Sequence, residues 1–282
     1  SQMRRNSQQT PRSTLVNDLG SVVIETAVQI ARKLLFIKTA KKALFYFAFV
    51  FVVSVYAFYF PPNEDYYFAK KHNVFNQYGT KVGWFWTLIT VGPFIWITSY
   101  LQNQNSHLKA VQSLIRLVVA TGIWYFVTHS FVHLEKVTGR CHGAKGAKQS
   151  ECSVSGGKWI PGIDLSGHCF LLIYNILILC EESLAFKNWS RFPKNTTKHV
   201  STPSEAENYK KMTLSVQGLF IILFVFHLFW DFQLLVTCLY YHTVNHKVLG
   251  AASAVISWFL TYKFVFPFFP GIPTANSHSK SA

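Results

Sequence analysis

Two histidines stand at the edges of long apolar blocks, where an imidazole can meet water and lipid headgroups together. His168 lies near the start of the block 165–184, and His242 directly follows another block. Two such imidazoles can divide the work of phosphoryl transfer: one attacks phosphorus to form a phosphohistidine, and the other protonates the leaving oxygen. Position alone also fits interfacial histidines that bond backbone carbonyls. Asp164 and Ser166, just before His168, have the side chains of helix caps.

Other ionisable residues inside the apolar blocks are candidates for chemistry or for buried pairing. His227 and Asp231 are four residues apart, so they share a helix face. Asp231 precedes His242 by about 16 Å along a straight helix, which is too far for a direct bond. Ionisable groups inside a membrane usually mark function, but pairing within the bundle is the simpler interpretation. Arg116 and Lys263 lie near the ends of their blocks, where long side chains can snorkel.

Two further pairs of polar residues are weaker candidates for a catalytic site. Glu181 and Glu182 follow His168 by about 20 Å along a helix, so they lie near the opposite membrane face and cannot be its acid–base partners. His129 and His133 are four residues apart and could bind zinc together with a third ligand. No His-Glu-x-x-His motif accompanies them. We therefore expect no metal and no other cofactor.

The composition indicates a polytopic membrane protein. Of the 282 residues, 50% are hydrophobic and 14% are charged, whereas soluble domains carry about 25% charged residues. Six apolar blocks approach the roughly 20 residues that cross a bilayer. They run from Ala43 to Phe60, Val82 to Tyr100, Val111 to His133, Leu165 to Leu184, Thr213 to Tyr241 and Ala251 to Phe269. We predict an all-α fold with six transmembrane helices in one domain, residues 43–273, followed by a cytosolic tail, residues 274–282.

The basic charge points to the membrane surface. The chain has 27 Lys and Arg against 12 Asp and Glu. No zinc-finger spacing or aromatic-basic motif indicates nucleic acid, so we expect no nucleic-acid partner. Residues 1–42 form a basic segment, in which 1–19 are polar and 20–42 mix apolar and basic residues at helical spacing. The second part predicts either an amphipathic helix on the membrane or a helical extension of the first span.

Loop charge predicts the orientation. With six spans both termini lie on one side, and the segments on that side carry 16 Lys and Arg against 9 on the other. The positive-inside rule then places the termini in the cytosol and both candidate histidines at the lumenal face. The sequons at Asn188 and Asn195 fall in a cytosolic loop and should stay unmodified. Cys141 and Cys152 share a lumenal loop and are the plausible disulfide pair.

Two segments around the histidines resemble the fat-storage-inducing transmembrane (FIT) family. The first reads Trp-Ile-Pro-Gly-Ile-Asp-Leu-Ser-Gly-His-Cys-Phe-Leu-Leu over residues 159–172 and continues to the glutamates at 181 and 182. The second reads Tyr-His-Thr-Val-Asn-His-Lys-Val-Leu-Gly over residues 241–250. Weaker similarities occur at residues 73–84, 121–125 and 269–273. The resemblance covers roughly residues 43–273.

The resemblance implies an enzyme of the endoplasmic reticulum membrane. FIT proteins are distant relatives of the type 2 lipid phosphatases, and by that pattern His168 is the general acid and His242 the nucleophile. The implied reaction is cleavage of the diphosphate in fatty acyl-CoA at the lumenal face. Its products are acyl-4'-phosphopantetheine and adenosine 3',5'-bisphosphate. The family also implies binding of di- and triacylglycerol, contact with membrane lipids and a role in lipid-droplet formation; the sequence leaves the oligomeric state open.

The chain departs from the lipid-phosphatase pattern where those enzymes bind phosphate. Leu165 stands in place of a proline, the Lys and Arg motifs that clamp phosphate are missing, and no Asp follows His242 by four residues to orient it. The departures keep open a second interpretation, a non-enzymatic protein that binds and partitions neutral lipid. Within the enzyme interpretation, the residues that we predict to bind substrate are Lys81, Ser166, Gly167 and Lys247.

Overall fold

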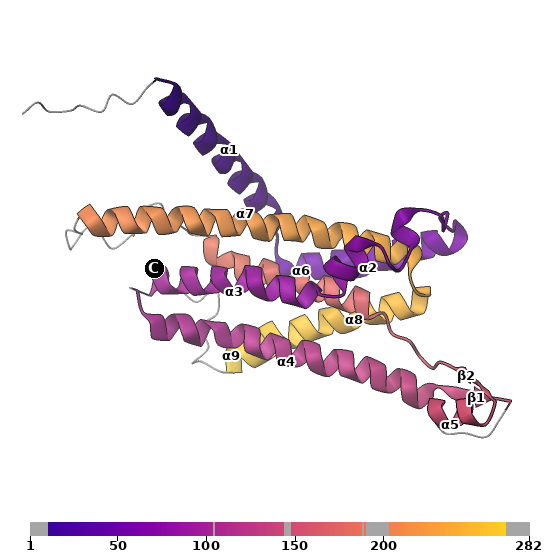
Figure 1. The fold of residues 1–282 in the computed structure, drawn as a ribbon. Helices are drawn as coiled ribbons and strands as arrows, with labels where there is room; N and C mark the ends of the chain where they lie inside the picture. The colour runs from indigo at the N-terminus through magenta and orange to yellow at the C-terminus, as the bar shows by residue number, and fades with distance from the viewer. Residues whose placement is uncertain (1–10, 104, 144–147, 188, 190–202, 269–282) are drawn as a thin grey trace, which may run out of the picture.

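The computed structural model describes residues 11–103, 105–143, 148–187, 189 and 203–268 (Figure 1). The tail 274–282 and both sequon asparagines lie outside the described residues. The α-helices and strands are α1 (Pro11–Leu35), α2 (Thr39–Tyr59), α3 (Gly83–Gln102), α4 (His107–Thr138), β1 (Arg140–His142), α5 (Gln149–Val154), β2 (Lys158–Ile160), α6 (Gly167–Ser183), α7 (Pro203–Tyr240), α8 (Val244–Phe259) and α9 (Phe266–Phe268). Short 3₁₀ or π turns are η1 (Tyr67–Ala69), η2 (Phe75–Thr80), η3 (Leu184–Phe186) and η4 (Leu260–Val265).

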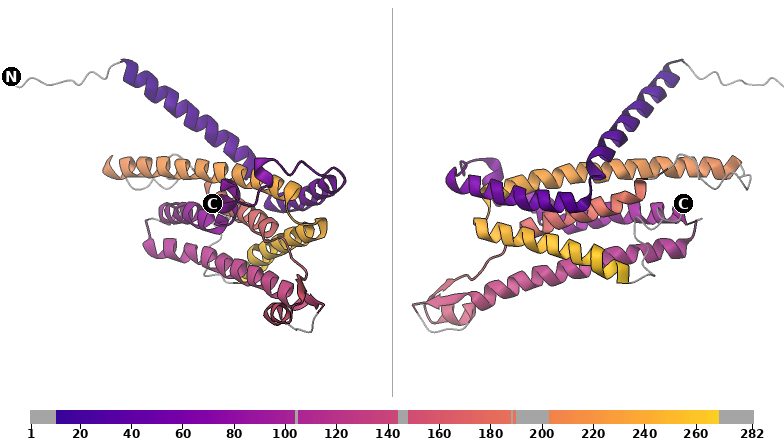
Figure 2. Two further views of the ribbon diagram at one scale, coloured as in Figure 1. Left: turned by 45° about the vertical axis from the view of Figure 1, so that its right-hand side comes forward. Right: turned by 180° about the vertical axis from the view of Figure 1, so that it is seen from behind.

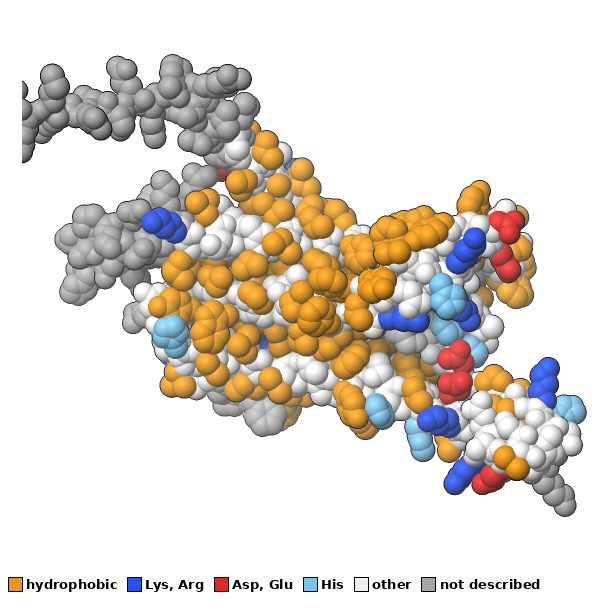
Figure 3. All heavy atoms as spheres, viewed as in Figure 1, with side chains coloured by type: hydrophobic (Ala, Val, Ile, Leu, Met, Phe, Trp, Pro, Cys, Tyr) orange, Lys and Arg blue, Asp and Glu red, His pale blue; other side chains and the backbone are white. Residues whose placement is uncertain are grey.

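Six of the described helices are long and apolar enough to cross a membrane, which confirms the predicted all-α class and the number of spans. They are α2, α3, α4, α6, α7 and the run from α8 to α9. Helix α6 is the central one: 89% of its apolar window is buried, against 28–44% in the other five. It packs against α2, α3, α7 and α8. Figure 3 shows hydrophobic side chains over the middle of the bundle, with charged side chains gathered toward the end that carries α5.

The last span begins earlier than the hydropathy pattern predicted. Helix α8 starts at Val244 rather than Ala251. The polar run Asn245-His246-Lys247 concealed its first turn, because a hydropathy block ends wherever polar residues cluster. Lys247 is therefore a helical residue and is buried, with its amine donating to the backbone carbonyl of Cys238 at 2.6 Å.

Helix α1 is separate from the first span. Residues 36–38 interrupt the helix between α1 and α2, so the two do not form one continuous extension. Its C-terminal end rests on the bundle through Arg32, whose guanidinium lies 4.8 Å from the ring centre of Phe186. The rest of α1 leaves the bundle at an angle (Figures 1 and 2). Its contact with a membrane surface stays a prediction.

A buried ion pair closes the end of the bundle opposite the histidines. The prediction that Arg116 snorkels is wrong: the residue is 4% exposed, and its Nη2 lies 2.7 Å from Glu182 Oε2. Tyr262 donates its hydroxyl to the other oxygen of Glu182 at 2.8 Å. A bonded carboxylate satisfies the guanidinium inside the bundle, so it has no need to reach water.

A second polar cluster lies within the spans. His227 Nδ1 lies 2.9 Å from Asp231 Oδ2, which confirms the predicted pairing on one helix face. Tyr46 of α2 donates its hydroxyl to Asp231 at 2.6 Å, and the Lys42 amine lies 3.0 Å from His227 Nε2. The partners of the Asp231 carboxylate are therefore His227 and Tyr46, and not His242.

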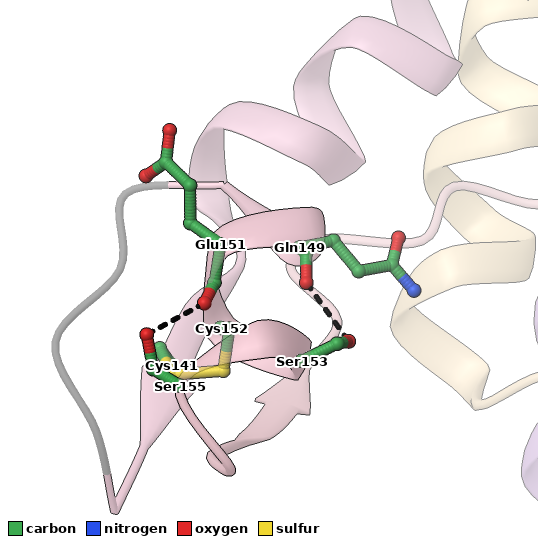
Figure 4. The surroundings of a disulfide bond; sticks show 6 residues. All are labelled: Cys141, Gln149, Glu151, Cys152, Ser153 and Ser155. Carbon is green, nitrogen blue, oxygen red and sulfur yellow. Dashed lines mark hydrogen bonds between the residues drawn. A yellow bond between two sulfur atoms is a disulfide. The ribbon is translucent and has the colours of Figure 1, made fainter.

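The loop after α4 folds into a small cap. Strands β1 and β2 pair antiparallel, with Cys141 opposite Trp159. A disulfide joins Cys141 to Cys152 of α5, as predicted (Figure 4). Figures 1 and 2 place this cap at the same end of the bundle as the starts of α6 and α8. Two ends of the bundle are therefore chemically distinct, and both histidines belong to the end with the disulfide.

Candidate functional site

The structure brings His168 and His242 together, as the phosphoryl-transfer hypothesis requires. His168 is in the first turn of α6, His242 is in the turn between α7 and α8, and their ring centres are 6.3 Å apart. The two helix starts are joined by a backbone hydrogen bond from Ser166 N to His246 O at 3.1 Å. Gly250 permits this approach: a Cβ there would lie 2.5 Å from the carbonyl oxygen of Ser166.

His242 has an unusual backbone conformation, and one of its ring nitrogens lies close to a carboxylate. Its φ is 57°, in the left-handed region that residues other than glycine seldom adopt. Its Nδ1 lies 3.2 Å from Oδ2 of Asp164, and its side chain is 21% exposed. A proton on Nδ1, on the side of this carboxylate, leaves the lone pair of Nε2 able to attack an electrophile. Backbone strain of this kind is concentrated at functional sites.

Asp164 is a functional candidate that the sequence reasoning assigned otherwise. It was expected to cap the fourth transmembrane helix, but Ser166 does so, accepting a hydrogen bond from Cys169 N at 3.3 Å. Asp164 contacts His242 from the loop before the helix instead. Asp164 can therefore take the role of the orienting carboxylate that the lipid phosphatases have four residues after the second histidine. One feature of the sequence could have indicated this role: Asp164 is an acidic residue four positions before His168, at the end of the bundle where His242 is also expected.

His168 is fixed by an asparagine from the segment between α2 and α3. Its Nε2 lies 3.0 Å from Oδ1 of Asn76. Asn76 is buried in the π turn η2 and donates its own amide to the Lys71 carbonyl at 2.8 Å, so the Oδ1 assignment is consistent. An Nε2–H bond to Asn76 leaves Nδ1 of His168 to exchange a proton. Asn76 falls in a segment that carried one of the weaker family similarities, and the sequence alone gave it no role.

Lysines from the same segment supply positive charge to the pair. Lys81 is exposed, and its charge acts on His168. Lys71 is exposed as well, and its charge acts on His242. Burial lowers the pKa of His242 below its ordinary 6.5, and the charge of Lys71 acts in the same direction, whereas the Asp164 carboxylate opposes both. The neutral imidazole, which is the nucleophilic form, is therefore favoured near neutral pH.

The four residues predicted to bind substrate have different surroundings. Lys81 is exposed and donates to the Gln77 side chain at 3.0 Å, and Gly167 has open space around its Cα. Ser166 and Lys247 are buried and bonded within the protein, the first as a helix cap and the second to the Cys238 carbonyl. A substrate contact by any of the four stays a prediction.

The loop that carries Asp164 is anchored to the end of α4. Ile163 N donates to the Thr138 hydroxyl at 2.8 Å. Gly162 packs so closely on this helix end that a Cβ would meet the Glu135 carbonyl at 2.6 Å. Directly before it, strand β2 is tied to β1, and the disulfide ties β1 to α5. The cap therefore fixes the position from which Asp164 reaches His242.

Loss of the disulfide should lower activity through Asp164. We expect the double substitution Cys141→Ser and Cys152→Ser to reduce kcat by about tenfold, because small displacements of a positioning group are costly in catalysis. Limited trypsin digestion should show faster cleavage in the cap. Reductant should reproduce the loss in the wild-type protein and have no effect on the double variant. Unchanged kcat in the double variant would mean that the cap does not position Asp164.

The arrangement is suited to group transfer through histidine. A carboxylate orients a neutral imidazole whose free nitrogen can attack, as in other nucleophile-orienting pairs. A second imidazole lies close enough to donate or accept a proton at the same reacting group. Two lysines border the pair and can attract an anionic substrate. Phosphate esters and anhydrides are the substrates that match this set of groups.

The comparisons with known proteins agree with this geometry. Residues 64–148 and 136–262 match the family described as fat storage-inducing transmembrane protein. The chain is 38% identical to an acyl-coenzyme A diphosphatase FITM2 of Caenorhabditis elegans, over 93% of this chain and 92% of the relative. It is 33% identical to the Homo sapiens protein of that name, over 75% of this chain and 78% of the relative.

A third relative of that name, from Drosophila melanogaster, is 31% identical over 94% of this chain and 67% of the relative. No solved structure matches the chain. The matched residues contain both histidines, the Asp164 loop and the Asn76 turn. This chain is therefore a member of the fat storage-inducing transmembrane protein family.

Proposed function

We propose that this protein is a fatty acyl-CoA diphosphatase, cleaving acyl-CoA to acyl-4'-phosphopantetheine and adenosine 3',5'-bisphosphate. The observation that carries the proposal is the Asp164–His242 pair beside His168, at the mouth of a transmembrane bundle. The printed names of the relatives supply the substrate class. A membrane enzyme suits this substrate, because the acyl chain partitions into the bilayer and the diphosphate stays at the interface.

In this reaction His242 is the nucleophile and His168 the proton-transfer group. Nε2 of His242 forms a bond to phosphorus, and the bond from that phosphorus to the bridging oxygen breaks. Asp164 holds the Nδ1 proton of His242 and stabilises the positive charge that develops on the ring. His168 first supplies a proton to the departing phosphate and then takes one from the water that hydrolyses the phosphohistidine.

The phosphate oxygens need positive partners that the lipid-phosphatase motifs do not supply here. Lys71 and Lys81 border the histidines and are exposed, so their amines can turn toward an incoming diphosphate. The start of α8 adds backbone donors, because the first N–H groups of a helix have no intrahelical acceptor. These groups follow His242 within three residues. Together they can replace the missing clamp.

We place the site in the lumen of the endoplasmic reticulum, with the termini in the cytosol. The disulfide supports this orientation, because it lies at the histidine end and disulfides persist in oxidising compartments. The excess of Lys and Arg on the terminal side supports it independently. Supply of lumenal acyl-phosphopantetheine and removal of acyl-CoA would link the enzyme to lipid-droplet formation.

The pH dependence should report the state of His242. Because its pKa is lowered from 6.5 and the neutral form attacks, the acidic limb of kcat/KM that reports His242 should lie below about pH 6.5. A profile measured between pH 4.5 and 8 would show this acidic limb. A limb centred above 6.5 would contradict the assignment. The charged groups that act on the His242 ring are Lys71, Asp164, His246 and Lys247.

Product identification tests the proposed function directly. Purified protein in detergent should convert oleoyl-CoA to the two proposed products, identified by mass spectrometry, and EDTA should leave the rate unchanged. Products of thioester cleavage, free CoA and fatty acid, would instead indicate a different hydrolase. The matched control is His133→Ala, since His133 is an exposed histidine near the end of α4.

The second candidate function, neutral-lipid binding, is favoured by the cluster inside the spans. The side chain of Asp231 is 34% exposed although it lies within a membrane helix, and Tyr46 and His227 hold it. Its carboxylate can accept a hydrogen bond from the hydroxyl of a diacylglycerol. Substituting His242→Ala separates the two functions: it should abolish hydrolysis and leave neutral-lipid binding intact.

A further inference from the structure

A cavity opens beside His242. Its volume is about 590 Å³, within the range of about 300–1,000 Å³ that is typical of ligand pockets. Its walls come from three helices. They are lined by Ser54, Ala57 and Phe58 of α2, Leu239 and Tyr240 of α7, and His242, Thr243, Val244, Asn245 and Lys247 of the turn and α8.

The cavity has a polar floor and an apolar side wall. Ser54 is fully buried, and its hydroxyl has no hydrogen-bond partner among the described residues. The Cys238 thiol, a weak hydrogen-bonding group, lies nearby. Phe58 also lines the cavity and is 70% exposed. An unpartnered buried hydroxyl is costly, so this floor is suited to a ligand that offers amide or hydroxyl groups.

The start of α8 joins the cavity to the attacking nitrogen. Thr243 is the N-cap, and Val244 and Asn245 are the first helical residues. These three residues line the cavity together with His242. A phosphate resting on this helix start lies within reach of Nε2, and whatever is attached to that phosphate can extend into the cavity. Lys71 and Lys81 belong to a different part of the site, the segment between α2 and α3 that also contains Asn76.

We propose that this cavity binds the phosphopantetheine arm of acyl-CoA, and so directs His242 to the phosphorus that bears pantetheine. This inference rests on the proposed function. The arm carries two amides and a hydroxyl that match the polar floor, and the acyl chain continues past Phe58 into the bilayer. The adenosine bisphosphate then lies toward Lys71 and Lys81, whose charges suit its two phosphates.

The proposal fixes the order of bond changes. A bond forms between His242 Nε2 and the pantetheine-bearing phosphorus, and the bond from that phosphorus to the bridging oxygen breaks. The bridging oxygen and its electron pair leave with adenosine 3',5'-bisphosphate. Water then attacks the phosphohistidine, its proton passes to His168, and the N–P bond breaks to release acyl-phosphopantetheine. The oxygen from water therefore enters acyl-phosphopantetheine.

Hydrolysis of oleoyl-CoA in ¹⁸O-labelled water tests this order in the wild-type enzyme. The label should appear in acyl-phosphopantetheine and be absent from adenosine 3',5'-bisphosphate. Label in the bisphosphate would overturn the inference and leave the proposed function standing, since the same anhydride would still have been cleaved. If neither acyl-phosphopantetheine nor adenosine 3',5'-bisphosphate forms, the proposed function is overturned, and the inference with it.

Filling the cavity tests the binding site separately. Ser54→Phe or Ala57→Phe should raise KM for oleoyl-CoA by about tenfold or more, since the arm and the new ring compete for one space. Val52→Phe is the matched control: Val52 is on the same helix but is 61% exposed to the outside. Unchanged KM in both cavity variants, with folding verified by thermal melting, would refute the site. Should either variant fail to fold, the isotope experiment decides without it.

Discussion

Substituting His242→Ala is expected to lower kcat for acyl-CoA cleavage by about 10³ or more, because loss of a covalent nucleophile removes the reaction path itself. The ring lies at the interface in a turn between two helices, with a side chain that is 21% exposed. Its removal therefore leaves the packed core intact. Initial rates on oleoyl-CoA, with a thermal melt of each preparation, measure both effects. His133→Ala, at the same end of the bundle, should retain full activity.

Substituting His168→Ala should also lower kcat, by about 10² to 10⁴, for a different reason. This variant keeps the nucleophile and lacks the proton-transfer group. A substrate with a better leaving group should therefore rescue it more than it rescues His242→Ala. Equal rescue would contradict the division of roles, although both residues would remain in the site. Full activity in His242→Ala would contradict the enzyme interpretation and leave neutral-lipid binding as the function.

Asp164→Asn is expected to lower kcat by about 10² to 10⁴, because an amide can donate to Nδ1 of His242 and so favour the tautomer whose Nε2 carries the proton. The substitution alters the contact of 3.2 Å between Oδ2 of Asp164 and Nδ1 of His242. KM should change little, since Asp164 acts through His242. Steady-state kinetics would separate the two parameters.

A pH profile distinguishes positioning by Asp164 from a merely structural role. The carboxylate raises the pKa of His242, so Asp164→Asn should move the acidic limb of kcat/KM to lower pH even as the rate falls. Asp164→Glu should restore part of the rate. Ser166→Ala, which removes the neighbouring helix cap, should lower thermal stability by about 1 kcal/mol without moving the limb. An unmoved limb in Asp164→Asn would contradict the positioning role.

The fold was predictable because a bilayer imposes a strong length and composition pattern on each span. All six spans were found from apolar blocks, and the largest error was the start of α8. There the polar run around Lys247 hid the first turn of a helix. The sequence could not reveal that Lys247 turns inward to the Cys238 carbonyl, because hydropathy reports polarity and not the partner that satisfies it.

The two histidines were predictable as a pair, but the groups that orient them were not. His168 begins the fourth span and His242 follows the fifth, so the alternation of the spans predicts that they share one end of the bundle. Asp164 reaches His242 only because the disulfide cap and the end of α4 fix its loop. Asn76 reaches His168 from a π turn far away in the sequence. Contacts of this kind depend on tertiary folding, and local spacing carries no signal for them.

Trapping the covalent intermediate tests the central claim most directly. With a substrate whose leaving group needs no acid, His168→Ala should form the phosphohistidine and hydrolyse it slowly, so a brief reaction with that substrate followed by alkaline quench should leave a phosphorus-containing adduct. Mass spectrometry of the digested protein should find that adduct on the peptide that contains His242, and find none in His168→Ala combined with His242→Ala. Turnover of oleoyl-CoA by the wild type, with the adduct on another residue or with none formed in His168→Ala, would contradict the assignment of His242 as the nucleophile.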